Sequence, residues 1–202
     1  METKELLLQK YGAFTEKPPK FIPGGRRSSG LAGLFKELGF TNGAEIGTEY
    51  GTYAKCLCDT MPGLKLLCVD AWMSYGDYRW NYSQESQEEI YNKCKEILAP
   101  YNVDIRRGFS MDVVKTIPDE SLDFVFIDGN HDFQNATNDI AEWSKKVKKG
   151  GIVSGHDYMR LRVKGEKLQV KDVLDGWTYA NGIKVWWVFT GDRGPSWFYV
   201  KE

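Results

Sequence analysis

Short runs of apolar residues alternate with segments of helical spacing from residue 44 onward. Five runs have the length and composition of buried strands: Ala44–Ile46, Leu64–Val69, Val103–Arg106, Leu122–Ile127 and Gly151–Ser154. The segments between them have helical spacing or composition: Thr52–Thr60, Gln84–Leu98, Met111–Thr116 and Gln134–Val147. Because strands that alternate with helices form crossover units, this pattern predicts a parallel sheet with helices on both faces.

The pattern changes after the fifth predicted strand. A helical stretch, Val170–Tyr179, is followed by two aromatic segments, Lys184–Phe189 and Trp197–Val200, which a glycine-rich turn separates. Two such segments joined by a turn predict an antiparallel hairpin. The expected fold class is therefore α/β: a doubly wound, Rossmann-like sheet of seven strands, in which five parallel strands are followed by a C-terminal antiparallel hairpin.

Residues 1–42 precede this alternation. They contain a short helical pattern (Glu5–Tyr11), a loop rich in proline and glycine, and a second amphipathic helix (Leu31–Leu38). Clusters of proline and glycine between periodic segments are typical of loops. We therefore expect an N-terminal extension that approaches or covers the site, not a separate domain, and one domain over residues 43–202.

Composition limits the class of protein. The chain has 202 residues, 42% of them hydrophobic, and 27 Lys and Arg against 28 Asp and Glu give a net charge of −1. This length suits one domain with a proper core. The balanced charge argues against nucleic acid as a partner, since binding a polyanion needs a basic excess. No run approaches the ~18 apolar residues of a membrane span, and no signal peptide is evident. The four cysteines lack disulfide-rich density and zinc spacing, so we expect reduced thiols in a cytoplasmic protein.

A turn that contains Gly47 and Gly51 follows the first predicted strand, where a helix begins. Glycines at this place let the backbone turn sharply and approach a ligand closely. Asp70 ends the second predicted strand, 19 residues after Gly51. A carboxylate at that spacing can accept hydrogen bonds from both hydroxyls of an adenosine ribose. The turn and the aspartate together predict a site for an adenosine-containing cofactor.

Two glutamates in this turn distinguish between adenosine cofactors. Glu49 stands where the dinucleotide pattern G-x-G-x-x-G has its central glycine, and Glu45 adds a second carboxylate. Like charges at close range would repel a pyrophosphate. S-Adenosylmethionine has no phosphate and carries a sulfonium and an ammonium, so it suits an acidic turn. A nucleotide-dependent oxidoreductase on a Rossmann sheet is the alternative.

Residues 45–51, EIGTEYG, resemble the E-x-G-x-x-x-G first motif of class I S-adenosylmethionine-dependent methyltransferases. Asp70 matches the acidic residue at the end of the second strand in that family, and the predicted strand count is similar to its fold. The resemblance covers roughly residues 40 to 202. It implies that the turn cradles the methionine part of the cofactor and that loop 108–111 packs on the adenine. The residues implied in cofactor binding are Glu45, Gly47, Gly51, Asp70, Ser110 and Asp128.

The two histidines of the sequence lie at the ends of the fourth and fifth predicted strands, each beside an aspartate. Carboxyl ends of parallel strands share one edge of a sheet, so both pairs are expected near the glycine turn. His131 can act as a general base on a hydroxyl acceptor, because imidazole titrates near neutral pH. Asp128, His156 and Asp157 can bind Mg²⁺ or Mn²⁺, since carboxylates with an imidazole suit these ions. The two roles use different residues and are compatible.

Both histidine segments resemble those of methyltransferases that modify hydroxyls of sugars and other natural products. That group often holds a cation with the aspartate after the fourth strand and an acidic pair after the fifth, and some members have a catalytic histidine at the place of His131. The chain departs from this pattern at His156, where an acidic residue is usual, which weakens the metal hypothesis or favours a softer cation. The resemblance implies O-methylation of a small-molecule or sugar hydroxyl.

An aromatic segment follows the second predicted strand. Aromatic residues that could cover the adenine or the acceptor gather after the second predicted strand: Trp72, Tyr75, Tyr78, Trp80 and Tyr82. A non-catalytic binding protein that keeps the cofactor fold is a second alternative. The sequence is compatible with a homo-oligomer, and it does not identify the methyl acceptor.

Overall fold

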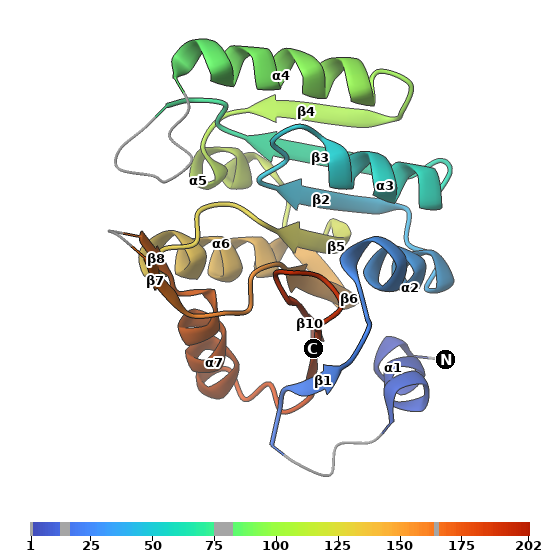
Figure 1. The fold of residues 1–202 in the computed structure, drawn as a ribbon. Helices are drawn as coiled ribbons and strands as arrows, with labels where there is room; N and C mark the ends of the chain where they lie inside the picture. Colours follow the sequence, from blue (N-terminus) through green and yellow to red (C-terminus); the bar gives the residue numbers. More distant parts are fainter. Residues whose placement is uncertain (1, 13–16, 75–82, 164–165) are drawn as a thin grey trace.

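A computed structural model describes residues 2–12, 17–74, 83–163 and 166–202. Its centre is an eight-stranded sheet in the order β1-β9-β10-β6-β5-β2-β3-β4 (Figure 1). The strands of this sheet are β1 (Lys20–Ile22), β2 (Asn42–Ile46), β3 (Lys65–Asp70), β4 (Val103–Arg107), β5 (Leu122–Ile127), β6 (Val147–Gly155), β9 (Trp186–Phe189) and β10 (Ser196–Val200). β10 is antiparallel to both of its neighbours, and the other pairs are parallel. The predicted parallel core and C-terminal hairpin are thereby confirmed.

Helices cover both faces of the sheet (Figure 1). One core lies against α1 (Thr3–Tyr11), α2 (Ala32–Glu37), α3 (Thr52–Thr60) and α4 (Gln84–Leu98). The other lies against α5 (Ser110–Val113), the 3₁₀ turn η2 (Val114–Thr116), α6 (Phe133–Lys146) and α7 (Val170–Ala180). Successive strand residues point to opposite faces, so the adjacent Trp186 and Trp187 divide between the two cores.

The sheet has eight strands and not the seven expected, because the N-terminal segment adds an edge strand. β1 pairs in parallel with β9, outside the hairpin. Three residues are too few to show an alternating pattern, and the surrounding prolines and glycines predict a loop. Leu7, Leu31 and Phe35 of the same segment are fully buried in the first core. The described residues of this segment, 2–12 and 17–42, are therefore fastened to the sheet, while the domain boundary at residue 43 stays a prediction.

Two more elements differ from the sequence pattern. α6 ends at Lys146 and β6 begins at Val147, four residues before the predicted start of this strand at Gly151. β7 (Leu161–Val163) and β8 (Glu166–Leu168) form a separate antiparallel pair between β6 and α7, in a segment without a clear strand pattern. None of the described helices is both long and apolar enough to cross a membrane.

Candidate active site

The glycine turn lies between the carboxyl ends of β3 and β5. The Gly47 N–H donates to the Val69 carbonyl at 2.8 Å, and the Asp128 N–H donates to the Ile46 carbonyl at 2.7 Å. Gly47 has φ of +87°, and a Cβ there would lie 2.1 Å from the Asp128 carbonyl oxygen. Glycine is thus required twice, by the left-handed backbone and by the close approach of β5.

Gly51 precedes α3 and also has a left-handed backbone, with φ of +76°. Glu49, between the two glycines, adopts φ of +48°, which is uncommon for a side chain with a Cβ. The buried indole of Trp72 donates to the Glu49 carbonyl at 2.9 Å and so helps to hold this strained residue. The four other aromatic residues predicted near the site, Tyr75, Tyr78, Trp80 and Tyr82, lie outside the described residues.

Asp70 lies beside the turn, at the end of β3. One of its oxygens accepts the Glu49 N–H and the other accepts the Trp72 N–H, both at 2.9 Å. Burial raises the pKa of Asp70, against the effect of these backbone donors. Each carboxylate oxygen has a second acceptor position. Asp70 can therefore hold the turn and still accept hydrogen bonds from a ligand.

Glu45 lies beneath the turn, 2% exposed, on the face of β2 that carries the first core. Its Oε2 is buried and finds no hydrogen-bond partner in the described part of the chain. Burial, followed by the nearby Asp128 charge, raises the pKa of Glu45 well above its ordinary value. Glu45 is thus a buried acid beneath the turn, where burial disfavours its charged form.

Ser110 opens α5 and is joined to α6. Its hydroxyl donates to Asp139 and accepts the indole N–H of Trp143 at 2.7 Å. Sequence analysis implied Ser110 in adenine binding but did not identify Asp139, which is 4% exposed. These bonds fix the loop after β4 against the helix after β5. The contact between Ser110 and Asp139 is hard to predict from the sequence, because an aspartate in an amphipathic helix is ordinarily exposed.

Asp139 makes stability depend on pH. Burial raises its pKa from 3.8 to about 6. As the pH rises, the Asp139 carboxyl loses its proton in the unfolded chain before it does so in the folded protein. The free energy of unfolding therefore falls as the pH rises from 4 to 7. The loss is about 3 kcal/mol. Asp139→Asn removes this titration. In urea unfolding at pH 4, 5, 6 and 7, the free energy of unfolding of the variant should therefore rise relative to that of the wild type as the pH increases. A constant difference across the series would refute this assignment.

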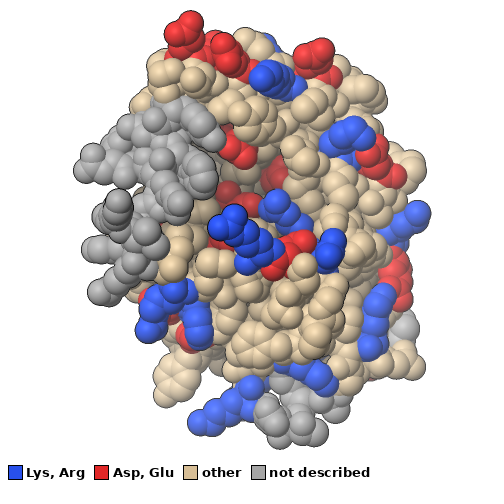
Figure 2. All heavy atoms as spheres, viewed as in Figure 1, with Lys and Arg blue, Asp and Glu red and all other residues tan. Residues whose placement is uncertain are grey.

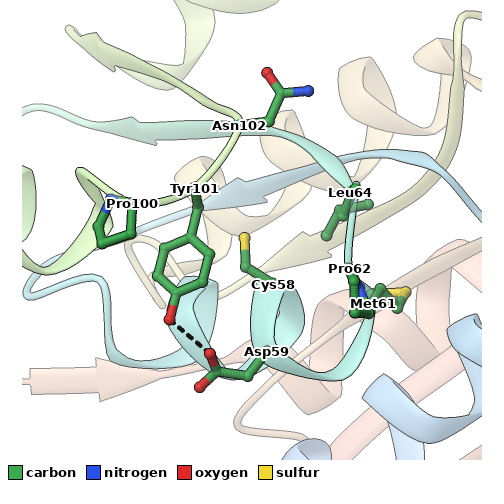
Figure 3. Close-up of a pocket in the computed structure, with 9 residues that line it drawn as sticks. Cys58, Asp59, Met61, Pro62, Leu64, Pro100, Tyr101 and Asn102 are labelled. Carbon is green, nitrogen blue, oxygen red and sulfur yellow. Dashed lines mark hydrogen bonds between the residues drawn. The ribbon is translucent and has the colours of Figure 1, made fainter.

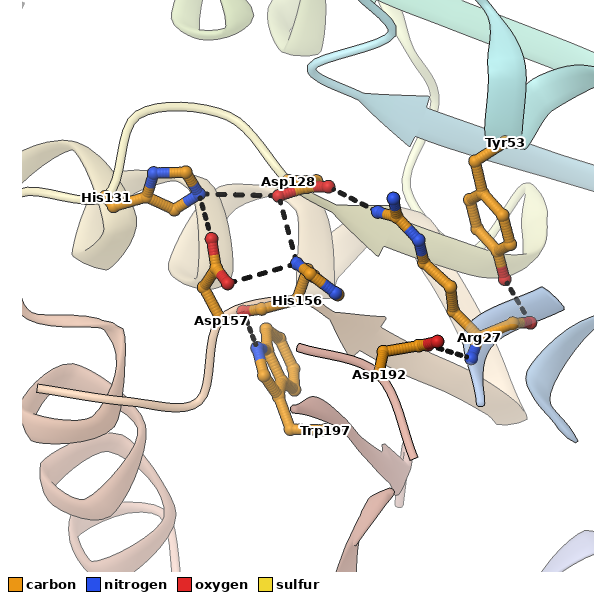
Figure 4. Close-up of polar contacts among 8 residues, drawn as sticks. All are labelled: Arg27, Tyr53, Asp128, His131, His156, Asp157, Asp192 and Trp197. Carbon is orange, nitrogen blue, oxygen red and sulfur yellow. Dashed lines mark hydrogen bonds and ion pairs between the residues drawn. The ribbon is translucent and has the colours of Figure 1, made fainter. Parts of the chain in front are cut away.

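The two histidines and two aspartates form one cluster (Figure 4). His131 Nε2 lies 3.3 Å from Asp128 Oδ1 and 3.2 Å from Asp157 Oδ2. His156 Nδ1 lies 3.2 Å from Asp157 Oδ1 and 3.8 Å from Asp128 Oδ1. The cluster joins the loop after β5 to the end of β6, as the sequence predicts. His131, which was expected apart from the metal ligands, contacts one oxygen of each carboxylate. His156 contacts the other oxygen of Asp157, Oδ1.

Three of these groups could hold a metal ion. Atoms of Asp128, His131 and Asp157 lie within 4.8 Å of one another. The metal set predicted from the sequence contained His156 in place of His131. His156 Nε2 is buried without a hydrogen-bond partner among the described residues. A Cβ on Gly194, in the β9–β10 turn, would lie 2.4 Å from the His156 ring, so this turn closes the cluster from one side.

Arg27 completes the cluster, and sequence reasoning missed it. It begins the short π-helix η1 (Arg27–Leu31), and its Nη1 donates to Asp128 Oδ2 at 2.8 Å (Figure 4). Burial opposes ionisation of Asp128, but the His131 hydrogen bond and the His156, His131 and Arg27 charges outweigh it and lower the pKa of Asp128. Figure 2 shows acidic and basic side chains gathered around a hollow on this face. Nothing in the sequence distinguishes Arg27 from Arg26.

A second hollow, of about 490 Å³, lies at the opposite ends of the strands (Figure 3). It is bounded by the end of α3 and the loop before β4, where Tyr101 donates to Asp59. None of the predicted site residues lines it. The glycine turn, Asp70 and the histidine cluster are therefore the candidate active site.

Comparisons with known proteins agree with this assignment. A family model described as a methyltransferase domain matches residues 44–158, more than half of the chain. A curated relative, the uncharacterized protein y4gI of Sinorhizobium fredii, is 27% identical over an alignment of 120 residues that covers 56% of this chain. The chain spans only 12% of the length of that relative.

Solved structures share the fold at low sequence identity. An O-methyltransferase from Bacillus cereus in complex with SAH has a TM-score of 0.62 and 20% identity, over 98% of this chain and 90% of that chain. The O-methyltransferase TomG from Streptomyces achromogenes, involved in tomaymycin synthesis and solved with SAM, has a TM-score of 0.61 and 17% identity, over 85% and 78% of the two chains. The Rossmann-like methyltransferase fold predicted from the sequence is confirmed, and the chain belongs to the methyltransferase-domain family.

Proposed function

We propose that this protein is an S-adenosylmethionine-dependent methyltransferase that O-methylates a hydroxyl of a small molecule or sugar. The observation that carries the proposal is the placement of Asp70 and the glycine turn on the same sheet edge as the His131 cluster. The two O-methyltransferases of similar fold were solved with SAH and with SAM, which supports this cofactor.

The residues at the turn fit S-adenosylmethionine better than a dinucleotide. Asp70 has acceptor positions for two ribose hydroxyls beyond its two backbone donors. Glu49 and Asp128 bring negative charge to the place where a pyrophosphate would otherwise lie. A sulfonium and an ammonium are favoured there. When bound, the cofactor supplies an electrophilic methyl group on a cationic sulfur.

His131 is proposed to take the proton of the acceptor hydroxyl as the methyl group is transferred. Its Nε2 lies between Asp128 Oδ1 and Asp157 Oδ2, and the side chain is 18% exposed. Two carboxylates beside one imidazole orient the ring and stabilise its protonated form. His156 holds the second oxygen of Asp157, and Arg27 holds that of Asp128, so both carboxylates are fixed.

A divalent cation is the second candidate at this cluster. Adjacent ligands of an ion with bonds of about 2.1 Å lie roughly 3.0 to 3.4 Å apart. The 3.3 Å and 3.2 Å separations of His131 from the two carboxylates fit that geometry. An ion at this place would position the acceptor oxygen and lower its pKa. In that case His131 would be a ligand and could not accept the proton at the same nitrogen.

The acceptor is proposed to be small and partly apolar. Large apolar side chains that are about half exposed follow three strands at this edge: Met73 after β3, Phe109 after β4 and Phe133 after β5. Exposed apolar side chains that gather at one edge favour a ligand site there. Phe109 lies in the loop proposed for adenine, which leaves Met73 and Phe133, the latter two residues beyond His131, for the acceptor.

Replacing Asp70 tests the cofactor site. Asp70→Asn keeps the shape and one acceptor oxygen but can no longer accept hydrogen bonds at both positions. We expect isothermal titration calorimetry to give binding of S-adenosylmethionine that is about 10- to 100-fold weaker, as for loss of a hydrogen bond to a charged group. Asp104→Asn, an exposed carboxylate on β4, is the matched control. Unchanged affinity in Asp70→Asn, or NAD binding by the wild type in its place, would overturn the proposed function.

A further inference from the structure

Arg27 is held firmly although it comes from the N-terminal segment. Its backbone N–H donates to Asp192 in the β9–β10 turn at 2.8 Å, and its carbonyl accepts the Tyr53 hydroxyl at 3.1 Å. The guanidinium lies over the Tyr53 ring, 5.4 Å from its centroid (Figure 4). Together with the ion pair to Asp128, these contacts fix the residue to three separate parts of the chain. An arginine that served only to neutralise a surface charge would need none of these contacts.

The guanidinium also lies next to the glycine turn. Tyr53 lies in the first turn of α3, the helix that begins directly after Gly51. Asp128, the ion-pair partner of Arg27, lies against the backbone of Gly47. The Arg27 side chain is 35% exposed. Among the described residues its guanidinium has one hydrogen-bond acceptor, Asp128 Oδ2. Several of its five N–H donors are thus available to a ligand at the turn.

The charges around Arg27 are predominantly negative. Burial raises the pKa of Glu49, and the charges of Asp70 and Asp128 raise it further, while Arg27 acts in the opposite direction. Burial is likewise the largest effect that raises the pKa of Glu45, and the Arg27 charge lowers it. An anionic group could enter this environment only where a cation receives it. Arg27 is the described basic side chain that acts on both glutamates.

S-Adenosylmethionine carries such a group. Its methionine part ends in an ammonium, which suits the acidic turn, and in a carboxylate, which does not. A guanidinium fork can bind a carboxylate through two parallel hydrogen bonds. On the basis of the proposed function, we infer that Arg27 binds the α-carboxylate of the cofactor, and that the N-terminal segment is thereby part of the cofactor site.

Decarboxylated S-adenosylmethionine provides the test, because it lacks only the group that Arg27 would bind. Calorimetry is carried out with both ligands on the wild type, Arg27→Gln, Arg27→Lys and the control Arg26→Gln, whose side chain is exposed on the same loop. We expect Arg27→Gln to weaken binding of S-adenosylmethionine at least tenfold. Its affinity for the decarboxylated ligand should stay within about threefold of the wild type or increase, since one cation has been removed from an acidic site.

The ratio of the two dissociation constants is the decisive readout, because partial unfolding of a variant lowers both affinities equally and leaves the ratio unchanged. Arg27→Lys should lie between wild type and Arg27→Gln, since lysine keeps the charge but not the fork. An equal loss for both ligands, or no loss for either, would overturn the role of Arg27 alone. If the wild type binds neither ligand, the proposed function fails and this inference with it.

Discussion

Replacing His131 with alanine is expected to lower the turnover of methyl transfer about 100-fold or more while leaving the affinity for S-adenosylmethionine unchanged. A positioned general base contributes about this much to a proton transfer. His131 lies beside the proposed methyl acceptor position and not beside Asp70, so the cofactor should bind as before. Turnover is measured with methyl-labelled cofactor and a panel of small-molecule and sugar hydroxyls, and affinity by calorimetry.

Three controls accompany this measurement, and the last two distinguish a general base from a bound cation. Gln134→Ala, an exposed change in the first turn of α6, should retain wild-type turnover. Chelation of divalent ions should leave the wild type active, and added imidazole should restore part of the activity of His131→Ala. Equal turnover in His131→Ala and wild type would refute the base assignment. Loss of wild-type activity on chelation, with recovery on adding Mn²⁺, would assign His131 to the metal site.

Replacing Gly47 with alanine is expected to reduce the free energy of unfolding by about 3 kcal/mol or more and to abolish cofactor binding. The new Cβ would lie 2.1 Å from the Asp128 carbonyl oxygen and 2.5 Å from its carbon. These are backbone atoms of the residue that directly follows the central strand β5, so relief of the overlap must move the end of β2 away from the end of β5. That movement would also displace the glycine turn and the cluster around Asp128.

Gly63→Ala is a closely matched control. Gly63 has φ of +86° against +87° for Gly47, and nothing lies within 4 Å of its added Cβ. It should lose only the cost of a left-handed alanine, about 1 kcal/mol. The difference between the two variants in the loss of the free energy of unfolding, measured with urea, gives the cost of the steric overlap apart from that of the left-handed backbone. Similar losses in the two variants would show that the approach of β5 to the turn does not require glycine.

The parallel core of the fold could be predicted because its central strands carry a strong local signal. Buried parallel strands are nearly continuous apolar runs, as in Leu122–Ile127, and a glycine or a polar residue marks where each one ends. β1 could not be predicted in this way. Its stability comes from pairing with β9, more than 160 residues later along the chain, and three residues contain no periodicity.

The same distinction applies to the site. The positions of Asp70, His131 and Asp157 at strand ends follow from the parallel topology, so their common edge could be predicted. The contact of Arg27 with Asp128 spans 101 residues and depends on how the N-terminal segment returns over the sheet. Burial of Asp139 and Glu45 likewise depends on helix and sheet packing, which the pattern of residue types does not contain.

A crystal structure of the complex with S-adenosylhomocysteine would test the central claim most directly. We predict that both ribose hydroxyls lie within hydrogen-bond distance of the Asp70 carboxylate, that the methionine part follows the turn from Gly47 to Gly51, and that the sulfur faces the side of the site where His131 lies. Adenosine bound elsewhere, with Asp70 still paired only to its backbone donors, would contradict the proposed cofactor site.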